Sequence, residues 1–215
     1  MLSGVYVTPF LLSAVLAQAA RYSDRADAAE LAAYFAERTV NLMAAEIAKG
    51  SSIPTLQGLF VFAGHESIIG RASQAWLYSG MAFRMMRDMG MHIHDRKLSL
   101  AGQFSPVELA LRRQIMWSCY TLDKTMSLLL GRAPMIHDTV PLPTVEGMLD
   151  GEEVEQEEWK PRFTTISALE VGVSQKASTN SRFVAICQLS TVSNSPTGDG
   201  SKKITATPYR SSTTS

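Results

Sequence analysis

A complete helix-start signal precedes the longest helical pattern in the chain. The stretch Ser105–Glu108 is a capping box, in which the Ser105 hydroxyl accepts from the Glu108 amide and the Glu108 carboxylate accepts from the Ser105 amide. The proline inside it reinforces the start, because its missing N–H is not needed in a first turn. From Gln114 to Leu130 the pattern is apolar on nearly every side, and Gly131 ends it. Such a helix must be enclosed by others, so we expect it to be the buried centre of a domain.

Earlier patterns in the chain are also helical and carry their own start and stop signals. They cover residues 10–22, 26–49, 53–69 and 71–89. Thr8-Pro9 is typical of a helix start, and Gly50, Gly70 and Gly90 follow the last periodic residues of three patterns. No stretch alternates apolar and polar residues as a half-buried strand does. The sequence therefore predicts an all-α fold, an irregular multi-helix domain over residues 1–145.

The composition changes after Pro143. Residues 146–160 hold seven acidic side chains, and Ser and Thr dominate residues 161–215 without helical periodicity. A segment of this kind cannot bury enough apolar surface to offset its chain entropy. We expect an acidic linker followed by a disordered tail.

Charge and cysteine content narrow the class of function. Lys plus Arg and Asp plus Glu each number 20, and no basic run is present that could displace counterions from phosphates. Binding of DNA by this chain alone is therefore not expected. Cys119 and Cys187 are too far apart to suggest a disulfide framework or a zinc site, and a reducing compartment suits them. No apolar run approaches the ~20 residues that span a bilayer, so no membrane partner is expected.

Few residues suggest catalysis or metal binding. His92, His94 and Asp95, with His65-Glu66 upstream, come nearest to a metal or acid–base cluster. However, His92 and His94 lie beyond the glycine stop in a loop, so we favour structural roles for the histidines. The alternative is a helical metal- or cofactor-binding enzyme that uses His92, His94 and Asp95.

Asp123 is the most unusual charge, because it lies inside an otherwise apolar helical stretch. An ionised carboxylate there needs a cation or several hydrogen-bond donors. The candidates for the cation are Arg84, Arg113 and Arg132. Either an ion pair fixes the central helix against the loop at Gly131, or the carboxylate lines an effector cavity; we favour the structural role.

Five short motifs follow one another in a specific order between residues 79 and 132. They are Ser79-Gly80-Met81-Ala82, Asp88-Met89-Gly90-Met91-His92, Arg112-Arg113 leading to Trp117, Leu122-Asp123-Lys124, and Leu130-Gly131-Arg132. Together they resemble the fungal-specific transcription factor domain, the regulatory middle region of fungal zinc-cluster activators, including the xylanolytic regulator type. The resemblance covers roughly residues 5 to 145.

Three departures from the family pattern are mild. The family usually has a Trp pair at Met116-Trp117, an Arg at Lys124, and a proline directly after Gly131-Arg132. The resemblance marks the following residues as structural motif positions, and none as catalytic, cofactor-binding or metal-binding: Asp88, Gly90, His92, Arg112, Arg113, Trp117, Asp123, Gly131 and Arg132.

The resemblance implies a non-enzymatic regulatory domain that acts in the nucleus. The family's DNA-binding module needs six cysteines to hold two zinc ions, so zinc and DNA would bind a segment other than this one, and this chain would hold no cofactor itself. It further implies control through homodimer contacts, transcriptional cofactors or a small-molecule effector. Because the family's domain normally continues with more helices after residue 145, we expect an incomplete copy of it here.

Overall fold

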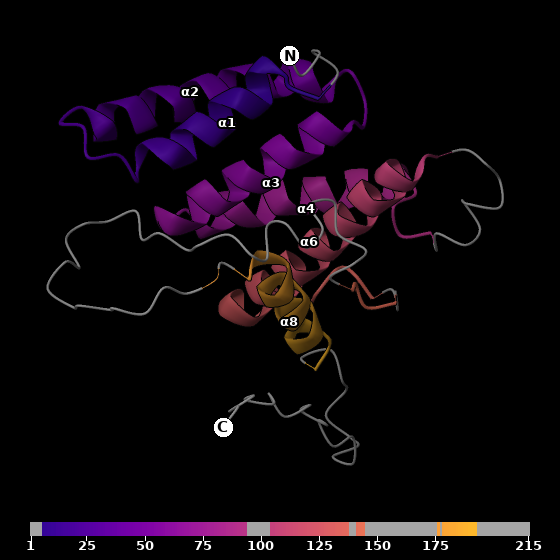
Figure 1. Ribbon diagram of the computed structural model, residues 1–215. Coiled ribbons are helices and arrows are strands. Elements are labelled where there is room, and N and C mark those ends of the chain that lie inside the picture. The colour runs from indigo at the N-terminus through magenta and orange to yellow at the C-terminus, as the bar shows by residue number, and fades with distance from the viewer. Residues whose placement is uncertain (1–5, 94–103, 138–140, 145–175, 177, 193–215) are drawn as a thin grey trace, which may run out of the picture.

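The computed structural model describes residues 6–93, 104–137, 141–144, 176 and 178–192. Within these ranges the chain forms six helices and no strand, which confirms the all-α prediction (Figure 1). The helices are α1 (Pro9–Ala20), α2 (Ala28–Ile47), α3 (Ile53–Ile68), α4 (Ala72–Asp88), α6 (Pro106–Leu130) and α8 (Thr179–Val192).

Side-chain caps mark the starts of α1, α3 and α6, and glycines follow the ends of α2, α3, α4 and α6. The capping box of α6 is complete: the Ser105 amide donates to a Glu108 carboxylate oxygen at 2.8 Å, and the Glu108 amide donates to the Ser105 hydroxyl at 3.3 Å. The hydroxyls of Thr8 and Ser52 cap α1 and α3 by accepting from the amides of Leu11 and Thr55. After α2, α3, α4 and α6 the chain turns through a glycine with positive φ, as the sequence predicts.

The helices pack as successive layers (Figure 1). α1 lies against both α2 and α3, α3 packs on α4, α4 packs on α6, and α6 packs on α8. The hydrophobic core runs through these contacts. Its largest fully buried apolar side chains are Trp117, Phe10, Phe62, Phe83, Leu56, Leu59, Met86, Met116 and Ile136.

A close approach between α1 and α3 depends on Gly58. A Cβ atom at this position would lie 2.5 Å from Cε1 of Phe10, well inside van der Waals contact. The Phe10 ring, only 1% exposed, therefore occupies space that any larger residue at position 58 would take. This contact sets the distance at which α1 crosses α3.

Helix α6 supplies the largest group of buried residues, as expected of the central helix. Its cover is not complete, since Val107, Leu128 and Leu129 near its two ends are exposed. None of the helices in the described ranges is both long and apolar enough to cross a bilayer.

Helix α8 corrects part of the tail prediction. We expected disorder throughout residues 161–215, but Thr179–Val192 forms a helix that packs against α6. Cys187 is fully buried in the core and Phe183 packs against it, so contact with α6 provides the burial that the sequence pattern did not reveal. The expected acidic linker and most of the expected tail lie outside the described residues, and the domain boundaries remain predictions.

Candidate functional site

The carboxylate of Asp123 is buried completely and holds the backbone that follows α6. It accepts hydrogen bonds from the amide of Met135 at 3.0 Å and from the amide of Ile136 at 2.8 Å. These amides are available because Gly131, with φ of 62°, ends the helix in a left-handed turn and sends the chain back along α6. We call residues 131–137 and 141–144 the return segment.

The prediction that an arginine pairs with Asp123 is wrong. The cation beside it is Lys124, whose ammonium lies 3.5 Å from the carboxylate and donates to the Ile136 carbonyl. The ammonium also lies 4.7 Å from the centroid of the Tyr120 ring. Adjacent side chains of α6 therefore bind the amide and the carbonyl of one residue, Ile136, whose own side chain is fully buried.

Two further contacts hold the return segment. The indole nitrogen of Trp117 donates to the carbonyl of Pro141 at 3.1 Å, so the segment still follows α6 two turns before Asp123. Near Gly131, the guanidinium of Arg132 lies 5.1 Å from the centroid of the Trp76 ring on α4. The structural alternative for Asp123, which fixes the Gly131 loop against the central helix, agrees with this geometry.

Arg112 joins α6 to the end of α4. Its guanidinium donates to the Met89 carbonyl at 2.6 Å and lies 4.4 Å from the centroid of the Phe104 ring. A cation at this position satisfies a carbonyl of the last helical turn and complements the helix dipole. The turn itself is made by Gly90, with φ of 66°.

The remaining motif residues lie around the same junction. Asp88 is exposed at the end of α4, His92 is half-buried after Gly90, and Arg113 is half-buried on α6. His94 and Asp95, the other members of the enzyme alternative, lie outside the described residues. Among the motif residues, Arg112, Trp117, Asp123 and Arg132 make contacts that join α4, α6 and the return segment.

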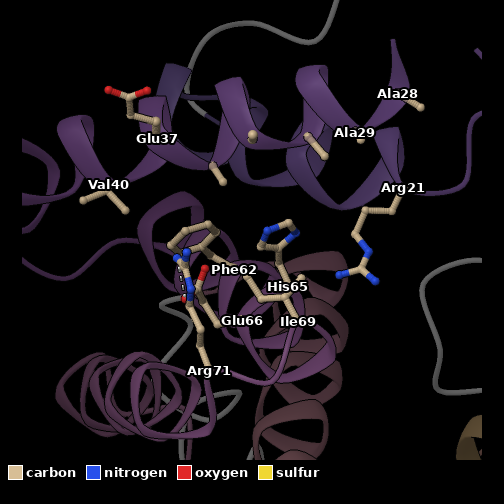
Figure 2. A pocket seen from close by; sticks show the side chains of 13 residues that line it. Arg21, Ala28, Ala29, Glu37, Val40, Phe62, His65, Glu66, Ile69 and Arg71 are labelled. Carbon is tan, nitrogen blue, oxygen red and sulfur yellow. Dashed lines mark ion pairs between the residues drawn. The ribbon is translucent and has the colours of Figure 1, made fainter. Parts of the chain in front are cut away.

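A pocket of about 760 Å³ lies between α2 and α3, away from these motifs (Figure 2). One face of α2 forms its upper wall through alanines at helical spacing. Alanine side chains are short and leave space at this face of α2, although Ala36, like Met43, packs against the core. The alanines are Ala28, Ala29, Ala32, Ala33 and Ala36.

The floor of the pocket is polar. His65 and Glu66 of α3 are 3% and 2% exposed, and Figure 2 shows both at the pocket. The His65 ring stacks on Phe62, with centroids 5.7 Å apart. A guanidinium nitrogen of Arg71 lies 3.6 Å from a Glu66 carboxylate oxygen. Arg71 is turned toward Glu66 because its amide donates to the Glu66 carbonyl across the Gly70 turn.

Burial changes the proton affinity of this floor. It lowers the pKa of the His65 imidazole below its usual range, and the guanidinium groups of Arg21 and Arg71 lower it further. It raises the pKa of the Glu66 carboxyl, and Arg71 offsets part of that rise. His65 Nδ1 and Glu66 Oε1 are buried and make no hydrogen bond with the described residues. They are two of several such atoms in the described residues, and both belong to residues that line the pocket.

The sequence motifs do not predict this pocket. His65 and Glu66 match a metal motif only in part, and the alanines of α2 indicate no more than a helix. The signal that could have been used is a polar pair inside the apolar α3 pattern, facing a helix with a stripe of small residues.

The family comparison decides which class of protein this is. A model of the fungal specific transcription factor domain matches residues 3–191, most of the chain and the whole described helical part. The chain belongs to this family. The match continues through α8, beyond the limit near residue 145 expected from the motifs.

Several curated relatives carry the same region. A transcriptional regulatory protein of Schizosaccharomyces pombe, itself uncharacterised, is 34% identical over 62% of this chain and 22% of its own length. The nitrogen assimilation transcription factor nirA of Emericella nidulans is 37% identical over 39% of this chain and 9% of its own. The activatory protein CHA4 of Saccharomyces cerevisiae is 30% identical over 47% of this chain and 17% of its own length.

The chain therefore spans less than a quarter of each of these three relatives. No solved structure matches it significantly. The chain carries the fungal specific transcription factor domain, and the printed names of these relatives describe transcriptional regulators or activators.

Proposed function

We propose that this domain controls the activity of a nuclear transcription factor whose DNA contacts are made by a segment outside these residues. The family match over residues 3–191 carries the proposal. The equal numbers of basic and acidic side chains support a role away from the DNA, because a duplex-binding surface needs an excess of positive charge. Zinc would bind that other segment.

A reporter assay in a fungal cell tests this. The full 215-residue chain is fused to an unrelated DNA-binding domain and compared with that DNA-binding domain alone. We expect the fusion to change reporter transcription and a fluorescent version of the chain to accumulate in the nucleus. Equal transcription from both proteins, with the fusion folded and present at equal amounts, would overturn the proposal.

We further propose that the domain is not an enzyme. Burial raises the pKa of both Cys119 and Cys187 to about 12, so neither thiol is a ready nucleophile. Within the described ranges no three His, Cys, Asp or Glu side chains gather in a way that could hold a metal ion. Elemental analysis of the purified full chain tests the alternative at His92, His94 and Asp95: stoichiometric metal that is lost in a His92→Ala variant would support that alternative.

Dimer contacts and transcriptional cofactors remain predictions from the family resemblance. Sedimentation of the full chain over a range of concentrations tests the first of them. A single monomeric species at every concentration would leave control to cofactors or to a small-molecule effector.

A further inference from the structure

We propose that the pocket between α2 and α3 binds a small organic anion that has an apolar body and a hydrogen-bond donor. As a binding site this stands on geometry alone; as the place where a signal reaches transcription it rests on the function proposed above.

The wall favours an apolar ligand body. The alanine stripe of α2 is opposed by the buried ring of Phe62, and Val40 and Ile69 lie exposed at its edges. A volume of about 760 Å³ is within the range of small-molecule sites. Apolar ligand atoms placed here would be removed from contact with water on both faces. This transfer out of water is the main source of affinity in such pockets.

The charge of the pocket favours an anion beside His65. Arg21 projects from the end of α1 on one side and Arg71 lies on the other (Figure 2). Arg71 has Glu66 as a partner, whereas no described acidic side chain pairs with Arg21. The other carboxylate of the lining, Glu37 on α2, is exposed. Arg21 is therefore the cation best placed to meet a ligand anion.

The floor calls for a hydrogen-bond donor. Glu66 Oε1 is a buried acceptor without a protein partner, and His65 Nδ1 beside it is equally unsatisfied. Both atoms are covered in this structure, so a ligand donor would bind Glu66 Oε1 only after a movement of the side chains around it. A buried polar atom without a partner needs a physical explanation, and a ligand donor at this pocket would supply one.

Two matched probes test the proposal on the full chain. 1-Anilinonaphthalene-8-sulfonate has an aromatic body, an N–H donor and a sulfonate, and N-phenyl-1-naphthylamine is the same body without the anion. We expect saturable binding of the sulfonate at one site per chain. Arg21→Gln should weaken it by about five-fold, the upper range for an exposed ion pair. The neutral probe should not respond to that change.

Alanine substitutions on one helix give a matched pair. Ala33→Phe fills the pocket and should abolish sulfonate binding, whereas Ala44→Phe, on the exposed part of α2 outside the pocket, should leave it intact. Arg38→Gln, also exposed on α2, is the charge control for Arg21→Gln. Circular dichroism confirms the fold of each variant, and Arg21→Gln tests the site even if Ala33→Phe does not fold.

Three results would overturn the proposal. These are binding that Ala33→Phe leaves unchanged, an equal response of both probes to Arg21→Gln, and no saturable binding, which would mean that water alone fills the pocket. Because the titration involves no transcription, a failed reporter assay with intact probe binding would refute the proposed function and leave the ligand site standing. The opposite pair of results would refute the ligand site alone.

Discussion

Replacing Asp123 with alanine removes the acceptor for two backbone amides in one step. The carboxylate is 0% exposed and binds the amides of Met135 and Ile136 at 3.0 and 2.8 Å. Hydrogen bonds to a charged group contribute roughly 1.5–3 kcal/mol each. The change also leaves the buried ammonium of Lys124 without its counter-ion, and removing one partner of a buried ion pair costs about 3–5 kcal/mol.

These costs overlap, because the same loop relaxes in response to all of them. We therefore expect Asp123→Ala to lower the free energy of unfolding by about 3–5 kcal/mol, against a total of ~5–15 kcal/mol for an ordinary domain. Asp123→Asn keeps the shape and one acceptor oxygen, and should lose about half as much. Asp24→Ala is the control, since Asp24 is exposed and should stay within about 0.5 kcal/mol of the wild type.

Urea unfolding of the full chain, followed by far-ultraviolet circular dichroism, measures all three changes. If Asp123→Ala matched Asp24→Ala, the contacts of the carboxylate with the return segment would contribute nothing to stability. The argument built on its burial would then be refuted.

Three other predictions concern local packing and protonation. Ser105→Ala removes one half of the capping box and should lower the free energy of unfolding by about 0.5–2 kcal/mol; an unchanged urea midpoint would contradict it. Gly58→Ala places a methyl group against Phe10 and should cost about 1–3 kcal/mol, where a stabilised variant would show that the ring moves freely. The lowered pKa of His65 means that the unfolded chain binds the proton more tightly, so its contribution to stability is complete above the ordinary pKa of about 6.5 and is lost as the pH falls below it. The wild type should therefore lose more unfolding free energy on acidification than His65→Gln. Parallel curves of unfolding free energy against pH for the two proteins would contradict the lowered pKa of His65.

Much of the fold could be predicted from sequence because its signals are local. The capping box at Ser105 and the glycine that ends α6 act within a few residues, so reading them needs no tertiary information. Helix α8 shows the limit of that approach. Its residues lack a strong amphipathic pattern, and what orders them is the burial of Cys187 against the core.

The candidate site was harder to predict for two physical reasons. The sequence predicted an arginine partner for Asp123 because side-chain charges can be read from a sequence, whereas the positions of backbone amides cannot. The amides that bind the Asp123 carboxylate lie beside it only because the chain turns back at Gly131. The pocket arises from missing volume: small residues on α2 leave space that becomes visible only once α3 is placed opposite. His65 and Glu66 can be recognised as candidate site residues only because they line that space.

The return segment also belongs to the folding unit that α6 centres, although it forms no helix. A chain cut directly after Leu130 would keep α6 entire, yet it would lose the groups that satisfy Asp123, Lys124 and the Trp117 indole. Irregular backbone here completes the core, because Ile136 is as buried as any residue of the helices. A boundary drawn at the end of α6 would therefore remove backbone and side chains that complete the core.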